Sequence, residues 1–394
     1  MEYIVIGISN EPDYILPDAV RQLLPSHKVF SGGKRHYELV KKHLPAHHHW
    51  IDIQGNMPVL FEQFSQHNGP VVVFASGDPL FYGFAGTIQK FDPAATMKIY
   101  PYFNSIQLLC HANNLAYANL RNVSVHGRSW DELDNALLTQ APMIGVLTDQ
   151  QKTPAVIAQR MLEYNFTNYR MIVGEDLGGL HHRTTTFELT EAIRHTAHQL
   201  NCVILVRTYR QAFSYGIADH LFYSLENRPN MITKMPVRLS SLSFLDLAGR
   251  NVLWDIGFCT GAVSIEARRS YPHLRIVAFE QRSECSELMD KNMRRHSTPG
   301  ITSVMGDFFE TDLHLYPAPD AVFIGGHGGR LEELLRKLDT LLPSGGRIVL
   351  NAVKEESKTQ FTAIAQALDY TLSTPMVIRV DDHNPITILG AEKR

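Results

Sequence analysis

A glycine-containing turn near residue 260 has the residue types that bind a nucleoside through the backbone. Asp255, Gly257 and Gly261 lie where a short apolar run ends and a helix-like segment begins. Such a turn brings backbone N–H groups and the start of a helix close to a ligand. Glu280 stands at the end of the next apolar run, where a carboxylate accepts hydrogen bonds from both hydroxyls of a ribose. We therefore expect an adenosine-containing ligand here.

A second acid extends this set. Gly306 and Asp307 end a later apolar segment, where a carboxylate can contact an adenine edge. The turn lacks the GxGxxG pattern that binds a pyrophosphate. Glu280 alone could equally be a helix-capping or surface acid, but the ordered set resembles the S-adenosylmethionine site of class I methyltransferases. The residues expected to contact this cofactor are Thr233, Asp255, Gly257, Phe258, Cys259, Thr260, Gly261, Glu280, Gly306 and Asp307.

Cys259 departs from that motif, which usually has a third glycine at this place. We expect the Cβ and Sγ atoms of Cys259 to crowd the methionine part of the cofactor. Binding at this turn would then be weakened or rearranged.

A second turn with exposed backbone groups lies near residue 80. A strand-like run ends in Ser-Gly-Asp-Pro, and Tyr82-Gly83 follows. Alone, this is also the pattern of an ordinary strand-to-helix turn. Further segments follow in order, however, and the set resembles the tetrapyrrole (corrin/porphyrin) methylases and, within them, the C5-methylating branch. These segments are residues 104–106, 123–128, 146–148, 153–158 and 174–179.

The tetrapyrrole methylases bind S-adenosylmethionine in a cleft between two α/β halves, largely through backbone groups. The first strand departs from their pattern, because Gly7-Ile-Ser9 stands where they have GxG and an acidic turn. We therefore expect an altered entrance loop beside an intact cofactor cradle. The resemblance implies that the cofactor contacts are Gly77, Asp78, Pro79, Tyr82, Gly83, Ser105, Ile106, Pro154 and Ala155.

Short apolar runs alternate with helix-length segments along the chain, which predicts an α/β protein with mostly parallel strands. The last two runs flank a turn and predict an antiparallel hairpin at a sheet edge. The expected strands are 2–8, 70–76, 142–147, 169–173, 202–206, 251–256, 274–279, 320–324, 346–350, 376–380 and 386–389. The expected helices include 17–24, 79–91 and 154–164, each with a proline near its first turn.

The pattern breaks between residues 207 and 230, which we interpret as a connector between domains. Residues 1–206 are expected to have the tetrapyrrole methylase fold of two α/β subdomains. Residues 231–394 are expected to form a Rossmann-like, seven-stranded class I methyltransferase domain. This second part resembles the C15-methylating, decarboxylating methyltransferases of the cobalamin pathway. The matching segments are residues 231–238 (MITKMPVR), 323–329 (FIGGHGG) and 347–353 (RIVLNAV).

In this order, the two parts resemble the fused C5,15-methylating enzymes of corrin-ring biosynthesis. The resemblance implies an S-adenosylmethionine-dependent C-methyltransferase of EC class 2.1.1. Its substrate would be a precorrin, precorrin-6B or its cobalt form, methylated at C5 and C15 with loss of the carboxylate from the ring C acetate. The alternative is a single-site C5 methylase whose C-terminal domain is a non-catalytic scaffold or substrate-holding module.

A tetrapyrrole carries several carboxylate arms, for which Arg, Lys and backbone N–H groups are suitable donors. For each candidate alone, a surface or structural role competes with substrate binding, and we favour Arg128 and Lys234. His327 replaces the serine of the resembling family. No catalytic residue is singled out, and no metal site is expected. The candidates for substrate binding are Arg128, Lys234, Arg238, His327 and Asn351.

The composition excludes some other classes. The 394 residues carry 37 Lys plus Arg against 40 Asp plus Glu, a net charge of −3, which disfavours a nucleic-acid partner. No apolar run approaches the roughly 18 residues that a membrane span needs. Four cysteines without a CxxC pair, and a start without a leader pattern, predict a cytoplasmic protein. The resemblance also implies a homo-oligomer formed through the C-terminal domain.

Overall fold

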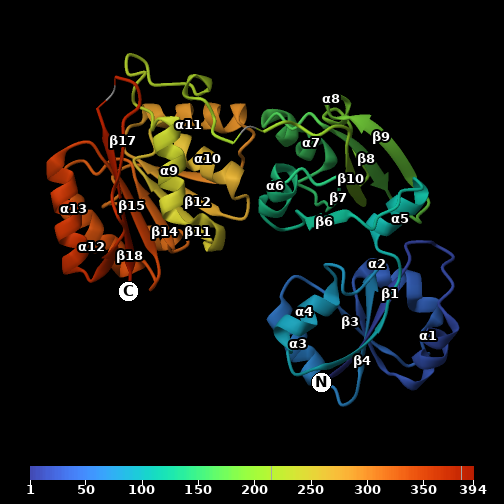
Figure 1. Cartoon of the computed structure of the whole chain (residues 1–394). Coiled ribbons are helices and arrows are strands. Elements are labelled where there is room, and N and C mark those ends of the chain that lie inside the picture. Colours follow the sequence, from blue (N-terminus) through green and yellow to red (C-terminus); the bar gives the residue numbers. More distant parts are fainter. Residues whose placement is uncertain (214, 383) are drawn as a thin grey trace. The chain divides into compact units, whose positions relative to one another are not determined.

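The computed structural model describes residues 1–213, 215–382 and 384–394. By its internal contacts the chain separates into two compact units (Figure 1). Residue 214 of the expected connector and residue 383 of the expected last turn lie outside the described residues. Unit 1 comprises Met1–Ser129, Ala141–Gln159 and Tyr169–Tyr209, and unit 2 comprises Trp130–Gln140, Arg160–Asn168 and Arg210–Arg394.

The first sheet of unit 1 is parallel throughout and has the strand order β3-β2-β4-β1-β5. Alternate side chains of its central strands enter two separate cores. Ile4 and Ile6 pack on one face, whereas Tyr3 and Val5 pack on the other. Burial on both faces explains the continuous apolar runs. The strands are β1 (Glu2–Ile8), β2 (Val29–Gly32), β3 (His49–Asp52), β4 (Val71–Ser76) and β5 (Thr96–Tyr100).

Helices cover both faces of this sheet (Figure 1). The core residues place α1 (Asp18–Leu23) and α2 (Lys34–Val40) on one face. On the other face lie α3 (Met57–Ser65) and α4 (Phe84–Phe91). The helix expected over 79–91 therefore begins later than predicted. The residues before Phe84 form a tight turn after β4.

The second sheet of unit 1 has the order β6-β7-β10-β8-β9, and only its β6–β7 pair is parallel among the described strands. The expectation of mostly parallel strands is wrong here. Seven residues join β8 to β9, and a parallel crossover needs about a dozen or more. The strands are β6 (Leu120–Ser124), β7 (Met143–Leu147), β8 (Tyr169–Glu175), β9 (Arg183–Glu188) and β10 (Asn201–Arg207). The neighbouring helices are α5 (Ser105–Ala112), α7 (Pro154–Glu163) and α8 (Leu189–Ala192).

Unit 2 contains one larger sheet with the order β13-β12-β11-β14-β15-β18-β16. The pairs from β13 to β15 are parallel, and β18 runs antiparallel to its neighbours. The strands are β11 (Val252–Ile256), β12 (Arg275–Glu280), β13 (Ile301–Met305), β14 (Ala321–Ile324), β15 (Arg347–Ala352), β16 (Tyr370–Leu372), β17 (Met376–Ile378) and β18 (Ile386–Lys393).

Two layers of helices cover this sheet. The core places α9, α10 and α11 on one face and α12 and α13 on the other. The chain runs outward from β11 to β13 and then returns to β14 on the other side of β11. Ligands of open α/β sheets bind where the strand order reverses in this way. The helices of unit 2 are α6 (Asp131–Leu138), α9 (Met235–Leu245), α10 (Ala262–Ser270), α11 (Glu284–Arg295), α12 (Leu331–Leu341) and α13 (Glu355–Ala367).

The hairpin expected at the sheet edge is present as β17 and β18. Within the described residues, however, the sheet has eight strands and not seven. The strand expected over 376–380 is present as β17, and an unpredicted strand, β16, precedes it as a second piece of the same sheet edge. Thr371 of β16 pairs with Glu392 whereas Val377 of β17 pairs with Thr387, a register shift of one residue. Pro375, which has no N–H group, lies between the two pieces. This is a bulge in one edge strand.

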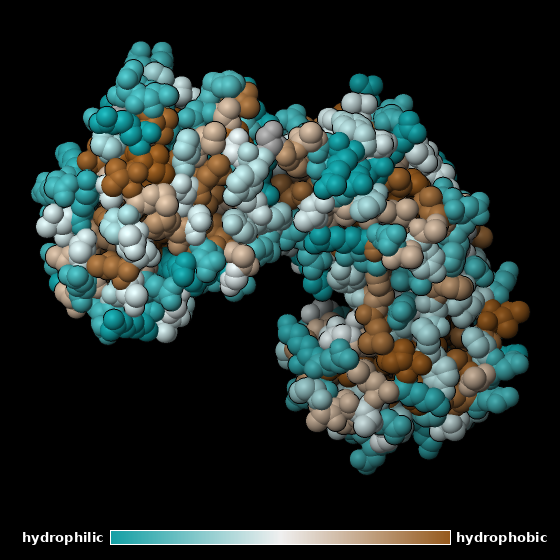
Figure 2. Space-filling view, in the orientation of Figure 1, coloured by the Kyte–Doolittle hydropathy of each residue, from teal (hydrophilic) through white to brown (hydrophobic). Residues whose placement is uncertain are grey.

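The visible surface in Figure 2 is largely hydrophilic, with smaller apolar areas. Exposed apolar side chains on unit 2 include Val377 of β17, which is 66% exposed. In the part of the chain that the structure describes, no helix is long and apolar enough to cross a membrane.

A buried ion pair anchors the start of α9. The Arg238 side chain is 0% exposed and donates from Nε to Glu266 Oε2 (3.2 Å). It also donates from Nη1 to Asp219 Oδ1 (3.2 Å) and the Thr233 carbonyl (2.7 Å), and from Nη2 to the Ile217 carbonyl. The expectation that Arg238 contacts substrate is therefore wrong. Its donors are all directed to the protein interior.

Replacing Arg238 by Met should destabilise unit 2 by about 3–5 kcal/mol, because Glu266 would stay buried without its cation. Urea unfolding, followed by a probe of unit 2, measures this loss. Arg336→Met is the matched control, because Arg336 pairs with Glu332 on the exposed surface of α12. Equal effects of the two substitutions would contradict the structural role of Arg238.

Candidate functional site

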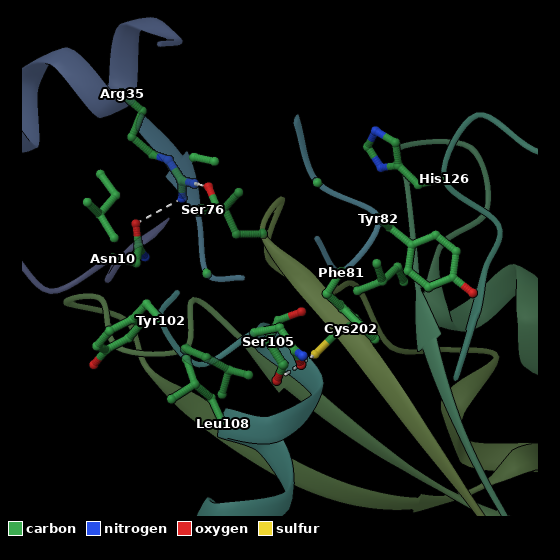
Figure 3. Close-up of a pocket in the computed structure, with 18 of the residues that line it drawn as sticks. Asn10, Arg35, Ser76, Phe81, Tyr82, Tyr102, Ser105, Leu108, His126 and Cys202 are labelled. Carbon is green, nitrogen blue, oxygen red and sulfur yellow. Dashed lines mark hydrogen bonds between the residues drawn. The ribbon is translucent and has the colours of Figure 1, made fainter. Parts of the chain in front are cut away.

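A cavity of about 830 Å3 opens in unit 1 beside the ends of strands from both sheets (Figure 3). Ser76 and Gly77, at the end of β4, line it from the first sheet. Ser105 at the start of α5 and Cys202 in β10 line it from the second. Its walls are thus strand ends and the turns that follow them.

The cavity depends on close contacts between backbone segments. A Cβ atom on Gly7 would overlap the Gly77 carbonyl oxygen and lie 2.7 Å from the Tyr102 nitrogen. A Cβ on Gly83 would lie 2.5 Å from the Pro79 carbonyl oxygen. Gly77 itself has a φ of +64°, a left-handed conformation that glycine adopts without strain. Larger residues would therefore force these segments apart.

Several residues predicted for the N-terminal cofactor cradle line this cavity, and so does Arg128, a candidate for substrate binding. The Arg128 guanidinium carbon lies 5.3 Å from the centre of the Tyr82 ring, and the Tyr82 hydroxyl donates to the Asn122 carbonyl (3.3 Å). The predicted residues that line the cavity are Gly77, Tyr82, Gly83, Ser105 and Arg128.

The other residues predicted for the N-terminal cofactor cradle are not among those that line the cavity. Asp78 Oδ1 accepts a hydrogen bond from the Leu80 nitrogen (2.9 Å) and so shapes the turn together with Pro79. Ile106 is 2% exposed and belongs to the core. Pro154 and Ala155 begin α7 and are not among the lining residues.

A polar group that was not predicted from the sequence lies on the opposite side of the cavity from Tyr82 and His126 (Figure 3). Arg35 donates from Nη1 to Asn10 Oδ1 (2.9 Å) and from Nη2 to Ser76 Oγ (2.6 Å). His36 Nε2 lies 2.9 Å from the same Ser76 oxygen. The available signal was the Lys-Arg-His run after Gly33. Ser9, where the first strand departs from the methylase pattern, is buried, and its Oγ accepts from the Glu11 nitrogen (3.2 Å).

In unit 2, the predicted turn after β11 meets the glycine-rich turn after β14. A Cβ on Gly257 would lie 2.8 Å from the Gly326 nitrogen, and the Gly325 nitrogen donates to the Ile256 carbonyl (2.8 Å). These turns follow the two strands between which the strand order reverses. The predicted turn after β11 therefore lies where ligands of open α/β sheets generally bind, at the point where the strand order reverses.

Cys259 adopts the left-handed backbone conformation that glycine favours, with a φ of +50°. Its Sγ lies 3.0 Å from the Met231 carbonyl oxygen and can donate to it. The neighbouring Phe258 and Thr260 are 5% and 1% exposed and belong to the interior. The turn thus presents mainly backbone atoms to a ligand.

Glu280 lies at the end of β12 and is 4% exposed. Its Oε2 accepts from the Cys259 nitrogen (3.0 Å) and from Arg282 Nη2 (2.6 Å), and its Oε1 accepts from Arg282 Nε (3.0 Å). Burial raises the pKa of Glu280, but the hydrogen bonds from Arg282 and backbone amides outweigh it and leave the pKa below its usual value. These bonds favour the ionised carboxylate, and a ligand hydroxyl could reach it only in place of a present donor such as Arg282, which was not predicted from the sequence.

Asp255, at the end of β11, has one carboxylate oxygen without a partner among the described residues. Its Oδ2 accepts from the Ser264 nitrogen (3.2 Å) and hydroxyl (2.6 Å). Burial, with a smaller contribution from the charge of Glu280, raises the pKa of Asp255 to about 7. A ligand N–H group at the unpartnered oxygen would favour the ionised form. The Glu280 carboxylate and this unpartnered oxygen are acceptors that suit a ligand with hydroxyl and N–H donors.

Gly306 and Asp307 lie beside Glu280, because the Gly306 nitrogen donates to the Glu280 carbonyl (2.9 Å). Asp307 Oδ1 accepts from the Phe309 nitrogen (2.8 Å), and Oδ2 pairs with Arg330 Nη1 (3.2 Å). The predicted acid is thus at the expected strand end and already has partners on both oxygens.

The remaining candidates lie at the edge of this site. Lys234 Nζ donates to Asn230 Oδ1 (3.5 Å), and Asn351 Oδ1 accepts from the Ser241 hydroxyl (2.9 Å). Asn351 Nδ2 and His327 Nδ1 are buried and have no hydrogen-bond partner among the described residues. Thr233 contributes its carbonyl to Arg238. Over the described residues, no group of His, Cys, Asp and Glu side chains could hold a metal ion.

Asp255→Asn should change how stability depends on pH. The pKa of Asp255 is raised in the folded state, so the folded state holds this proton more tightly and its stability falls as the pH rises from about 4 to 7. The Asn variant lacks this contribution. Relative to the wild type it should gain up to about 4 kcal/mol across that window. Chemical unfolding at several pH values tests this, and a constant difference would contradict the raised pKa.

Several known proteins resemble parts of this chain. A family model described as "Precorrin methyltransferase domain" matches residues 226–388. A Cobalt-precorrin-6B C(15)-methyltransferase (decarboxylating) of Salmonella typhimurium is 37% identical over 139 residues, which are 35% of this chain and 70% of the relative. A crystal structure of precorrin-6y C5,15-methyltransferase from Geobacter metallireducens GS-15 is 34% identical, with 45% of this chain and 97% of that chain covered and a TM-score of 0.42.

One relative matches along most of the chain and includes both units. The Precorrin-6Y C(5,15)-methyltransferase (decarboxylating) of Sinorhizobium sp is 32% identical over 351 residues, which are 89% of this chain and 84% of the relative. The match is longer than either unit and so includes parts of both, and the chain belongs to the family of decarboxylating precorrin-6Y C5,15-methyltransferases.

Proposed function

We propose that this chain methylates a precorrin at C5 and C15 and removes the carboxylate of the ring C acetate, in corrin-ring biosynthesis. S-adenosylmethionine supplies both methyl groups in this proposal. The observation that carries it is the 32% identity to a C5,15-methylating relative over 89% of the chain. A match confined to one unit would have supported only one of the two methylations.

Each methylation is assigned to its own part of the chain. Residues 1–206, with the cavity of unit 1, methylate C5. Residues 231–394, with the turns after β11 and β14, methylate C15 and carry out the decarboxylation. The domain model that matches residues 226–388 and the C15-specific relative support the second assignment. The residues that we predicted as cofactor contacts remain part of the proposal.

The reaction depends on the alignment of the reacting atoms more than on a strong base. The reacting ring carbons behave like enamine carbons and attack the sulfonium methyl in line, so holding three atoms aligned and excluding water supplies most of the rate. When the bond to the carboxylate breaks, its electron pair passes into the conjugated C=N system and carbon dioxide leaves. A proton from water or a nearby acid then completes the new methyl group. In unit 2, ribose hydroxyls would take the place of Arg282 on Glu280.

The proposal also includes the cellular location and the self-association of the enzyme. A biosynthetic enzyme of a small-molecule tetrapyrrole would work in the cytoplasm. Self-association through the C-terminal domain would cover apolar side chains such as Met376 and Val377 at the edge of its sheet, which are 41% and 66% exposed.

One feature favours a second candidate, a C5 methylase with a non-catalytic C-terminal domain. Glu280 is saturated by Arg282 and by the Cys259 nitrogen, and Cys259 replaces the usual glycine of the turn. If Arg282 never yields, the ribose cannot bind. Product analysis distinguishes this candidate from the two-site enzyme.

Glu280→Gln should slow the second methylation and leave the first intact, so that products are compared after an incubation just long enough for the wild type to finish. Loss of the charged acceptor should slow C15 methylation by about 10- to 100-fold. Mass spectrometry of the product should show one added methyl and a retained carboxylate, against two methyls and one lost carbon dioxide for the wild type. Glu284→Gln, an exposed acid in the first turn of α11, is the matched control. Identical products from wild type and Glu280→Gln would contradict the assignment.

Cys259→Gly should preserve or increase the rate of C15 methylation. Glycine adopts a φ of +50° without the strain that a side chain adds, and the space near the cofactor increases. The substitution removes the hydrogen bond from the thiol to the Met231 carbonyl, and a thiol is a weak donor. Initial rates from C15-methylated product measure the effect. A large loss of rate would show that the thiol has a positive role.

A further inference from the structure

Arg35 has neutral partners and faces the cavity of unit 1. Its guanidinium donates to Asn10 Oδ1 and Ser76 Oγ, and no described carboxylate forms an ion pair with it within 4 Å. An arginine has five N–H donors, so three remain for a ligand. In Figure 3, the Arg35 side chain extends over the cavity from α2, on the side of Asn10 and Ser76.

The hydrogen bonds of His36 identify its tautomer. The Gly33 nitrogen donates to His36 Nδ1 (3.2 Å), so Nδ1 carries no proton. Burial and the nearby charge of Arg35 lower the pKa of His36 to about 4, which keeps the ring neutral near pH 7. A neutral ring carries its one proton on the other nitrogen. His36 Nε2 therefore donates to Ser76 Oγ, 2.9 Å away.

Ser76 Oγ thus accepts two hydrogen bonds, one from Arg35 Nη2 and one from His36 Nε2. A hydroxyl has two lone pairs, which these donors occupy, and one proton that it can donate. Ser76 is exposed and lines the cavity, so its proton is available to a ligand in the cavity. Arg35 and Ser76 together present only donors.

Asn10, which is hydrogen-bonded to Asp176, holds Arg35 in this position. Asn10 accepts from Arg35 and donates from Nδ2 to Asp176 Oδ1 (2.6 Å). The other oxygen of Asp176 accepts from the His181 nitrogen (2.9 Å). Both of these donors are neutral, so the charge of Asp176 still acts on Arg35, but without an ion pair within 4 Å. A carboxylate in the cavity would be a direct anionic partner for Arg35.

We propose that Arg35 and Ser76 bind one carboxylate arm of the tetrapyrrole during C5 methylation, with Asn10 and His36 as positioning residues. This inference rests on the proposed function. A carboxylate suits the site because it accepts from a guanidinium and a hydroxyl at once. The methyl donor also carries a carboxylate, and Ser76 directly precedes Gly77 of the turn expected to hold the donor. Arg35, however, comes from α2 and lies across the cavity from Tyr82 of that turn (Figure 3). We therefore assign the arm to the tetrapyrrole.

The test uses Arg35→Gln and Ser76→Ala in the full chain. The reduced precursor corrinoid is varied at saturating S-adenosylmethionine, and initial rates of C5 methylation give KM and kcat. Arg35→Gln should raise KM for the corrinoid by about 10- to 100-fold, and Ser76→Ala by about 2- to 10-fold. Calorimetric affinity for S-adenosylhomocysteine should stay unchanged, which also shows that the variants are folded.

Lys34→Gln is the matched control, since Lys34 is an exposed cation beside Arg35 that does not line the cavity. It should leave KM unchanged. An unchanged KM in Arg35→Gln would overturn the subsite. A weaker affinity for S-adenosylhomocysteine without a change in corrinoid KM would overturn it too, because Arg35 would then hold the carboxylate of the methyl donor. A wild-type chain that transfers no methyl to C5 would overturn the proposed function itself, and that failure is visible without any variant.

Discussion

Backbone segments that meet at strand ends without intervening side chains are the constraint on which both sites depend. In unit 1, Gly7 lies against Gly77 and the Tyr102 nitrogen. In unit 2, Gly257 lies against the Gly326 nitrogen. Parallel strands deliver their carboxyl ends to one edge of a sheet, and only glycine lets the turns there pack so closely. Ligand contacts can then come from N–H and C=O groups, which need few charged side chains.

The charged groups that are present already have partners in the chain. Glu280 is held by Arg282, and Arg35 is held by Asn10 and Ser76. These partners keep the groups in position before any ligand arrives. In the proposed sites a ligand exchanges with Arg282 on Glu280, whereas it binds the remaining donors of Arg35. Binding costs less ordering of side chains this way, although the outgoing partner has to be replaced by a comparable hydrogen bond.

Features of local origin could be predicted from the sequence, and features that depend on long-range pairing could not. Strand β1 has the predicted bounds because the apolar run that predicts it is local in the sequence. Strand β2, only four residues long, and the antiparallel order of β7, β10 and β8 were missed, because pairing partners decide them.

The same distinction explains the site predictions. The turns at Gly77 and Gly257 were found from contiguous residues. Arg35 was missed because its partner Ser76 lies 41 residues away in the sequence. Arg238 was assigned to substrate because its burial against Glu266 is a tertiary property.

The central claim is that one chain carries out two methylations at two separate sites. Incubation of the wild-type chain with the reduced precursor corrinoid and methyl-13C S-adenosylmethionine, followed by carbon NMR of the product, tests it most directly. If both methylations occur, the product will carry two labelled methyl groups, one at C5 and one at C15, and an unlabelled new methyl on ring C where the acetate lost carbon dioxide. A single labelled methyl, with the ring C acetate intact, would contradict it.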